Sequence, residues 1–388
     1  MDTSFESAFK KVKVLVEDFQ KHSARYLRTD YKEQEVRDDF INPFFDALGW
    51  DVSHREQRDP FHQEVKVEKS EREGRVDYAF RKAPDFKNPV FFVEAKKPSV
   101  DIKNELHYLQ TIKYAWNAGL PVSILTDFQQ LHILDTRNKA KANDGSAFTG
   151  DHKEYHFTDY ANEKKFAEIY FTFSREAIEK GNLDAYVQQL RKPKGKAIQT
   201  GLFKGAFRPV DEDFLAYIDD LREELAKALK KNNEDLQSEA LTEATQRIID
   251  RLVFIRFLED KEILEDYLID KFGAKGNTWS DFISACLLLN TQYNGVVFKK
   301  HFIDDHHFKG PDETMFRDIC RDICHLNTDY NFRYIPIHIL GSIYERFLGK
   351  VVHATDKRVK IEEKPEVRKA GGVYYTPKYI VEYIVENT

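Results

Sequence analysis

Apolar residues near the start of the chain recur at the three- and four-residue spacing of one helix face. They are Phe5, Phe9, Val12, Val16 and Phe19. This spacing predicts a helix over residues 4–28. A second helix is predicted over about 32–48, because its apolar stripe ends at Gly49, a common residue at helix ends.

The region after Gly49 predicts short strands and one helix. Alternating or wholly apolar stretches indicate strands at 64–68, 75–80, 90–96, 122–125 and 131–134. A turn rich in Pro, Asp and Asn separates the second and third strands, and a helix over about 101–117 follows the third. This order predicts an α/β domain over residues 1–190, with a mixed central sheet flanked by helices.

The second half of the chain is mainly helical in pattern. Two apolar faces stand out: Phe214, Ile218, Leu221, Leu225 and Leu229, then Ile248, Leu252, Ile255 and Leu258. We expect a basic linker at 191–209, a helical connector domain at 210–350, and the start of a third domain at 351–388 that opens on a charged loop. The linker is either a solvated hinge or a contact to DNA phosphates.

Composition excludes several classes of protein. No run of about 18 apolar residues and no signal peptide are present, so we expect a cytoplasmic chain without a membrane span. Three cysteines fit a reducing compartment, and the Cys320–Cys324 spacing favours core residues over a zinc site. The net charge of −6 counts against a small dedicated DNA-binding domain unless basic residues cluster. The sequence has no phosphate-binding Gly-Lys-Ser/Thr loop, which argues against an ATP motor.

Two acids and a lysine form the candidate chemical centre. Side chains alternate along a strand, so Glu94 and Lys96 point the same way, about 7 Å apart. An antiparallel neighbour can bring Asp77 beside Glu94. Two carboxylates about 4 Å apart repel by roughly 4 kcal/mol at an effective dielectric near 20, and a hard cation such as Mg²⁺ removes that conflict. Asp77 and Glu94 are the candidate metal ligands, and Lys96 would orient a water or screen charge. Ordinary solvated charges on a surface hairpin are the alternative interpretation.

This arrangement resembles the PD-(D/E)xK nuclease superfamily, with Val76-Asp77 in place of Pro-Asp. Gln110 and Tyr114, one helical turn apart, resemble the Gln-x-x-x-Tyr element of Type I restriction motor subunits and related recombination nucleases. In those proteins the Gln lies near the metal. Routine helix packing explains the pair equally well.

Glu33 lies on the inward stripe of its predicted helix, together with Val36, Phe40 and Phe44. An acid on such a stripe needs a partner, either a metal-bound water or a basic residue. The segment from Glu33 to Trp50 also resembles the opening of Type I and Type IIG nuclease domains.

Residues 370–377 read Ala-Gly-Gly-Val-Tyr-Tyr-Thr-Pro ahead of an apolar helical pattern. An N-capping Thr followed by Pro in the first helical turn is enough to explain these residues as an ordinary helix start. The segment nevertheless resembles the opening motif of gamma-class N6-adenine DNA methyltransferases. That resemblance implies that Tyr375, Thr376 and Pro377 contact S-adenosylmethionine. The family's Gly-rich loop and Asn-Pro-Pro-Tyr motif do not occur in this sequence, so this chain alone is not expected to methylate DNA.

The order of nuclease, helical connector and methyltransferase start resembles Type IIG restriction–modification enzymes, and we expect the chain to be a fragment of a longer protein. The resemblance implies Mg²⁺-dependent cleavage of double-stranded DNA through Asp77, Glu94 and Lys96, supported by Gln110 and Glu33. It also implies S-adenosylmethionine as a cofactor of the full-length enzyme and a transient dimer for double-strand cleavage. The alternative is a non-cleaving DNA-binding and assembly module of a methyltransferase, with a relic nuclease fold.

Overall fold

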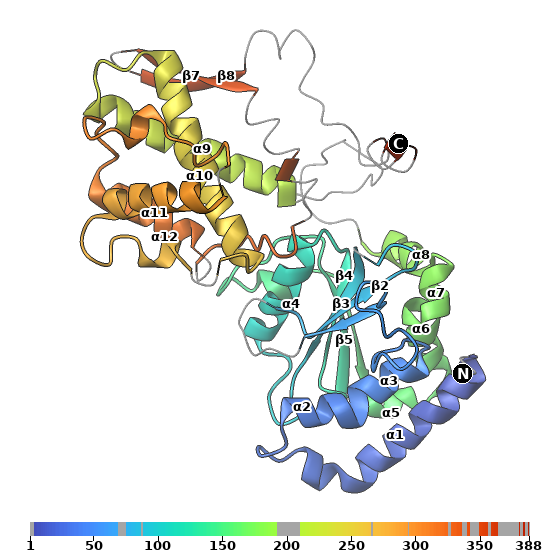
Figure 1. Ribbon diagram of the computed structural model, residues 1–388. Helices are drawn as coiled ribbons and strands as arrows, with labels where there is room; N and C mark the ends of the chain where they lie inside the picture. Colours follow the sequence, from blue (N-terminus) through green and yellow to red (C-terminus); the bar gives the residue numbers. More distant parts are fainter. Residues whose placement is uncertain are drawn as a thin grey trace. The chain divides into compact units, whose positions relative to one another are not determined.

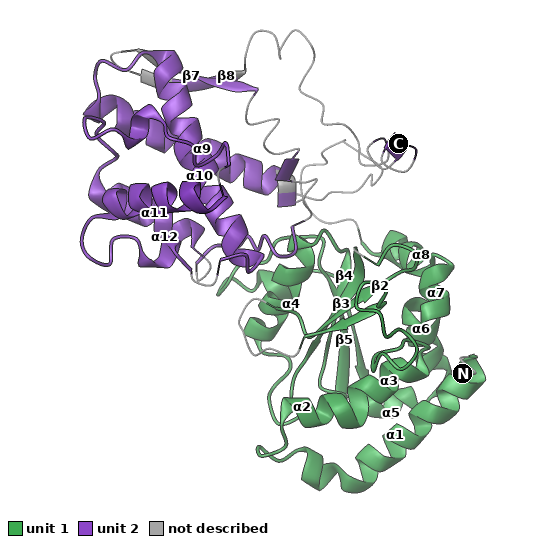
Figure 2. Cartoon of the chain, viewed as in Figure 1, with its two compact units in different colours: residues 1–209 green, residues 210–388 purple. Residues whose placement is uncertain are grey.

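The computed structural model describes residues 4–68, 75–86, 88–191, 210–264, 267–293, 295–324, 327–335, 340–341, 349–355 and 358–363, together with 380, 383, 384 and 387. The chain divides into two compact units, Met1–Pro209 and Val210–Thr388 (Figure 2). Within the described ranges, no helix combines the length and apolar character needed to cross a membrane.

A six-stranded sheet forms the centre of unit 1 (Figure 1). Its strands lie side by side in chain order: β1 (Val65–Val67), β2 (Tyr78–Arg81), β3 (Pro89–Ala95), β4 (Val122–Thr126), β5 (Gln130–Asp135) and β6 (His152–His156). β3 and β4 are parallel, whereas the other neighbours are antiparallel. The prediction of a mixed α/β sheet is therefore confirmed. The sequence pattern does not predict β6, because only Tyr155 of this edge strand is buried.

Helices cover both faces of the sheet (Figure 1). The helical segments of unit 1 are α1 (Phe5–Tyr26), α2 (Glu33–Val36), η1 (Arg37–Ile41), α3 (Asn42–Ala47), α4 (Glu105–Asn117), η2 (Ser146–Phe148), α5 (Phe157–Tyr160), α6 (Glu163–Phe173), α7 (Arg175–Glu179) and α8 (Asn182–Gln189). The larger core lies between the sheet and the helical segments other than α4 and η2. A smaller core, which includes Tyr108, Ile112 and Leu125, lies under α4.

The alternation along β3 sorts its side chains as predicted. Phe91, Val93 and Ala95 belong to the larger core. Phe92 and Glu94, on the other face, are also buried. Both faces of β3 are therefore covered, and the charge of Glu94 lies inside the unit rather than on a solvated hairpin.

The second predicted helix is continuous but changes its winding. α2 leads into the π-helical segment η1, in which the N–H of Asn42 donates to the carbonyl of Arg37, and α3 follows directly. Pro43 has no N–H to donate in the first turn of α3. The helix ends before Gly49, whose φ of 93° only glycine adopts without strain.

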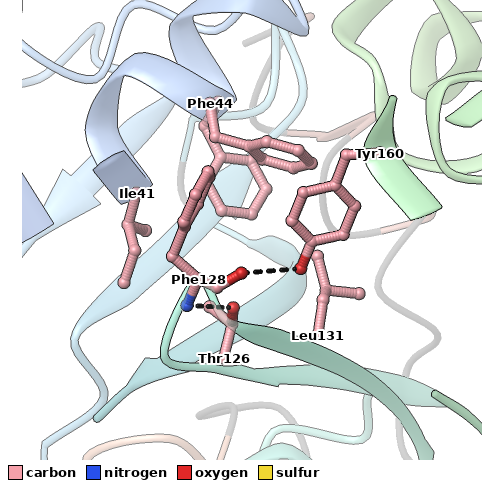
Figure 3. A pocket seen from close by; sticks show the side chains of 7 residues that line it. Ile41, Phe44, Thr126, Phe128, Leu131 and Tyr160 are labelled. Carbon is pink, nitrogen blue, oxygen red and sulfur yellow. Dashed lines mark hydrogen bonds between the residues drawn. The ribbon is translucent and has the colours of Figure 1, made fainter. Parts of the chain in front are cut away.

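The turn between β4 and β5 is anchored in the larger core. Phe128 adopts a φ of 66°, its N–H donates to Oγ1 of Thr126, and its carbonyl accepts the hydroxyl of Tyr160 at 3.0 Å (Figure 3). A cavity of about 10 Å³ lies beside it, lined by Ile41, Phe44, Phe45, Thr126, Phe128, Leu131 and Tyr160. Such a volume holds about one water, so this gap is a packing imperfection and not a ligand site.

Unit 2 is built on two long helices. Its elements are α9 (Val210–Asn232), α10 (Ser238–Asp260), η3 (Ile269–Lys271), α11 (Thr278–Tyr293), η4 (Phe302–Asp304), α12 (Glu313–Ile323), β7 (Lys350–Thr355) and β8 (Arg358–Glu363). Every residue of the two predicted apolar faces is buried in α9 and α10. Cys286, Cys320 and Cys324 are likewise buried, as the core interpretation requires.

The sequence predicts a charged loop over residues 353–369, and this is wrong for the described residues 353–355 and 358–363. β7 and β8 pair as a hairpin, with Val352 opposite Ile361. The N–H of Val352 donates to Oγ1 of Thr242 in α10 at 3.0 Å. An antiparallel hairpin with one solvated face needs only a few buried apolar residues. The many charged residues of this segment therefore obscure the alternation of apolar and polar residues that would indicate strands.

Candidate active site

Glu94 and Lys96 are hydrogen-bonded at the end of β3, where Glu94 is buried and Lys96 is partly buried. Nζ of Lys96 lies 2.7 Å from Oε1 of Glu94, and the two side chains are 13% and 4% exposed. The other carboxylate oxygen, Oε2, is buried and accepts no hydrogen bond. A buried acceptor without a donor is costly, so this oxygen favours binding a cation or a donor from outside the chain.

Asp77 lies beside Glu94, but not within a strand as the sequence predicts. β2 begins one residue later, at Tyr78. The Oδ2 atom of Asp77 accepts the N–H of Ala95 at 2.7 Å, and Oδ1 accepts Nη1 of Arg37 at 3.0 Å. The side chain of Asp77 thus takes the place of a backbone acceptor where β2 and β3 diverge, which fixes its carboxylate next to the residue that follows Glu94.

Glu33 also faces this site. It is partly buried at the start of α2. Burial and the neighbouring charge of Asp77 raise its pKa, while Lys96, Arg37 and Lys97 oppose the increase. Glu33 is thus partly buried, with both an acid and basic residues within its electrostatic reach, and its role at the centre stays a prediction.

Crowded negative charge dominates the electrostatics of the site. Burial and then the charge of Asp77 raise the pKa of Glu94 to about 8, although Lys96 opposes this shift. Burial also raises the pKa of Asp77, against the effects of Arg37 and Lys96. Burial alone would lower the pKa of Lys96, but the contact with Glu94 outweighs it and raises the value. The site therefore favours additional positive charge, either a proton or a cation.

The donor set suits a hard divalent cation. Both acids offer oxygen, the ligand type that Mg²⁺ prefers, and one oxygen of Glu94 has no other partner. Among the residues that the structure describes, no three His, Cys, Asp or Glu side chains group closely enough to hold a metal by themselves. A cation at Asp77 and Glu94 would therefore keep several water or substrate oxygens, as Mg²⁺ does.

The helix α4 lies near the site, but Gln110, the residue of α4 that the sequence assigns to the site, is hydrogen-bonded within the helix. The amide of Gln110 donates to the hydroxyl of Tyr114 at 3.5 Å, a long hydrogen bond between helix neighbours. Burial lowers the pKa of His107, and the charge of Lys96 lowers it further, so this face of α4 lies within electrostatic reach of Lys96. A role for Gln110 at the centre stays a prediction.

Arg37 is a residue of the site that the sequence reasoning does not assign. Its guanidinium holds Asp77 and is buried. The available signal is its position, one turn after Glu33, because a buried Arg needs an acidic partner. Tyr375, Thr376 and Pro377 lie outside the described residues, as do 192–209 of the predicted linker.

The raised pKa of Glu94 predicts a pH-dependent cost in stability. The pKa of Glu94 is about 8 in the folded chain, against an ordinary value of 4.5. As pH rises from 4.5 to 8, the unfolded chain ionises first, so the free energy of unfolding decreases. Glu94→Gln removes that loss. In calorimetry with a chelator present, the melting temperature of Glu94→Gln relative to the unsubstituted protein should rise from pH 5 to pH 9.

The exposed Glu17 in α1 provides the control, since Glu17→Gln changes the same charge without burial. Its melting temperature should follow that of the unsubstituted protein at every pH. An equal and constant offset for both variants would show that Glu94 is an ordinary ionised acid in the folded chain.

Comparison with known proteins finds a relative of this chain by sequence. The chain is 30% identical over 382 residues to the Type II restriction enzyme and methyltransferase RM.Eco57I of Escherichia coli. The alignment covers 96% of this chain and 36% of the relative, so the chain spans about a third of that protein's length. No family model matches the chain, and no solved structure matches it. The chain is thus similar, almost from end to end, to part of a protein named for both restriction and methylation.

Proposed function

We propose that unit 1 is a Mg²⁺-dependent DNA endonuclease domain of a Type IIG-like restriction–modification protein, with a PD-(D/E)xK-type centre. The observation that carries the proposal is the buried Oε2 atom of Glu94, which has no partner and lies beside a second fixed acid, Asp77. The similarity to RM.Eco57I supports DNA as the substrate.

Asp77 and Glu94 would hold the cation through their carboxylate oxygens. When bound, Mg²⁺ would lower the pKa of a coordinated water and neutralise charge building on the phosphate. Glu94 must give up its proton to act as a ligand, so metal binding should strengthen as pH rises toward 8.

Lys96 supplies the fixed positive charge of the centre. Its ammonium carries three donors, of which one is used by Glu94. The others can hold the attacking water or a phosphate oxygen, where a buried charge stabilises developing negative charge more strongly than in water. Glu33 and Gln110 would support this arrangement from α2 and α4.

A second candidate function is a DNA-binding and assembly module without cleavage. One observation favours it: both oxygens of Asp77 already accept hydrogen bonds from the protein. A carboxylate offers about four lone-pair positions, so two are left for a cation. The two candidates therefore differ in a measurable property, the affinity of the site for metal.

Calorimetric titration of Mn²⁺ into the full-length protein and into Asp77→Ala separates the two functions. The nuclease proposal predicts saturable binding that Asp77→Ala weakens by at least tenfold, and cutting of duplex DNA by the unsubstituted protein with Mg²⁺ and S-adenosylmethionine. DNA binding with no metal affinity and no cutting would instead establish the assembly module.

The same similarity supports a proposal for the wider architecture. We infer that residues near Tyr375, Thr376 and Pro377 begin a methyltransferase domain that binds S-adenosylmethionine in the full-length protein. Cleavage of both strands of a duplex by a single centre per chain would use a transient dimer. Both statements are part of the proposed function.

A further inference from the structure

The Arg37 guanidinium joins three points around the candidate centre. Its Nη1 donates to Oδ1 of Asp77 at 3.0 Å, and its Nη2 donates to the carbonyl of Glu68, next to the end of β1, at 2.9 Å. Its Nε donates to the hydroxyl of Tyr78 at 3.2 Å. The residue is only 7% exposed. One buried side chain therefore ties η1 to the adjoining ends of β1 and β2.

Tyr78 fixes the orientation of that guanidinium. Its ring lies under the guanidinium at 4.8 Å, and its hydroxyl donates to Oδ1 of Asn42 at 2.8 Å. The Tyr78 hydroxyl is thus committed as an acceptor for Nε of Arg37. Only a planar, forked cation meets all of these directions at once, and the flexible ammonium of lysine does not.

The Asp77 carboxylate is consequently held from two sides. Arg37 binds Oδ1, and the N–H of Ala95 binds Oδ2. The two remaining lone-pair positions have fixed directions, which an unrestrained side chain would not give them. The π-helical winding of η1 begins at Arg37 itself, and such segments often occur at functional sites.

We propose that Arg37 is a positioning residue, which orients Asp77 for metal binding without itself touching the cation or the DNA. This inference rests on the proposed nuclease function. If Arg37 only stabilised the fold of unit 1, its replacement would lower stability without changing metal affinity.

Arg37→Lys tests the proposal, because it keeps the charge and removes the fork. Groups that orient metal ligands typically contribute 10- to 100-fold to metal affinity, so Mn²⁺ should bind the full-length variant at least tenfold more weakly. Single-turnover cleavage should slow at saturating DNA, with unchanged DNA affinity.

Arg175→Lys is the matched control. Arg175 pairs with the buried Glu64 at 2.8 Å in the same unit, outside the site. Similar losses of melting temperature in both variants, with full Mn²⁺ affinity in both, would overturn the positioning role. Tyr78→Phe provides a second variant if Arg37→Lys does not fold. It removes the acceptor of Nε and should weaken Mn²⁺ binding in the same direction, and unchanged binding would again overturn the proposal.

The two proposals fail in different ways. If the unsubstituted protein binds no Mn²⁺, the nuclease function fails and the role of Arg37 fails with it. If it binds Mn²⁺ and cuts DNA while Arg37→Lys and Tyr78→Phe do so equally well, only the positioning role is lost.

Discussion

The proposed nuclease function predicts that Lys96→Ala in the full-length protein slows DNA cleavage by about 10²- to 10³-fold, the usual effect of removing one preorganised group that stabilises transition-state charge. Lys96 is nearly buried and its Nζ lies 2.7 Å from Glu94. A buried ammonium cannot be replaced by bulk water or salt, because its field is strong only where water is excluded. The rate should be measured in single-turnover cleavage of duplex DNA at saturating Mg²⁺.

Lys97→Ala is the control for Lys96→Ala, since it removes the same charge from the next position. Lys97 and Glu94, both described by the structure, form no ion pair, and the charge of Lys97 affects Glu33 less than that of Lys96 does. Its loss should change cleavage by a few-fold at most, mainly through DNA affinity at low salt. Equal rates for Lys96→Ala and the unsubstituted protein would remove Lys96 from the mechanism and, with it, the central assignment of the site.

The parts of the site that sequence could predict are those set by local geometry. Alternation along one strand is enough to put Glu94 and Lys96 on one side of β3, opposite the core residues Phe91 and Val93. Helical spacing is likewise enough to turn Glu33 inward. Both patterns depend on residues two to four positions apart, so no knowledge of the distant chain is needed.

The features of the site that the sequence does not predict are the position of Asp77 and its contact with Arg37. Asp77 is off the strand because the ladder between β2 and β3 gives way to a side-chain acceptor at Ala95. Arg37 reaches Asp77 across 40 positions of sequence through a π-helical turn. Neither the end of a ladder nor local rewinding of a helix leaves a periodic signal, because both are decided by tertiary contacts.

The same contrast holds in unit 2. The apolar faces of α9 and α10 follow directly from helical periodicity. The β7–β8 hairpin does not, because charged residues are compatible with either a loop or a half-exposed strand. Nor does the sequence predict the partners of Arg251, which is buried in α10 and bonds to Asp304 and to the carbonyls of Val297 and Lys299.

One of those buried pairs gives the largest stability effect that we expect. Arg251 in α10 and Asp304 at the end of η4 form an ion pair whose side chains are 0% and 1% exposed. The Nη2 atom of Arg251 donates to Oδ2 of Asp304 at 2.9 Å and to the carbonyl of Lys299 at 3.0 Å. Asp304→Ala leaves the guanidinium buried without its counter-charge, which should destabilise unit 2 by roughly 3–5 kcal/mol. Urea unfolding monitored in the full chain measures this loss.

The exposed pair of Lys300 and Asp305, 3.7 Å apart, supplies the control. Asp305→Ala should change stability by no more than about 0.5 kcal/mol, as usual for surface substitutions. The effect of Asp304→Ala should also depend on pH. Burial opposes ionisation of Asp304, but the hydrogen bonds from Arg251 and His301 outweigh it and lower the pKa below 3.8. The stabilisation is therefore complete above pH 3.8 and lost as pH falls through the lowered value. A difference between Asp304→Ala and the unsubstituted protein that stays constant down to pH 2 would contradict an ionised aspartate as the source of the stability.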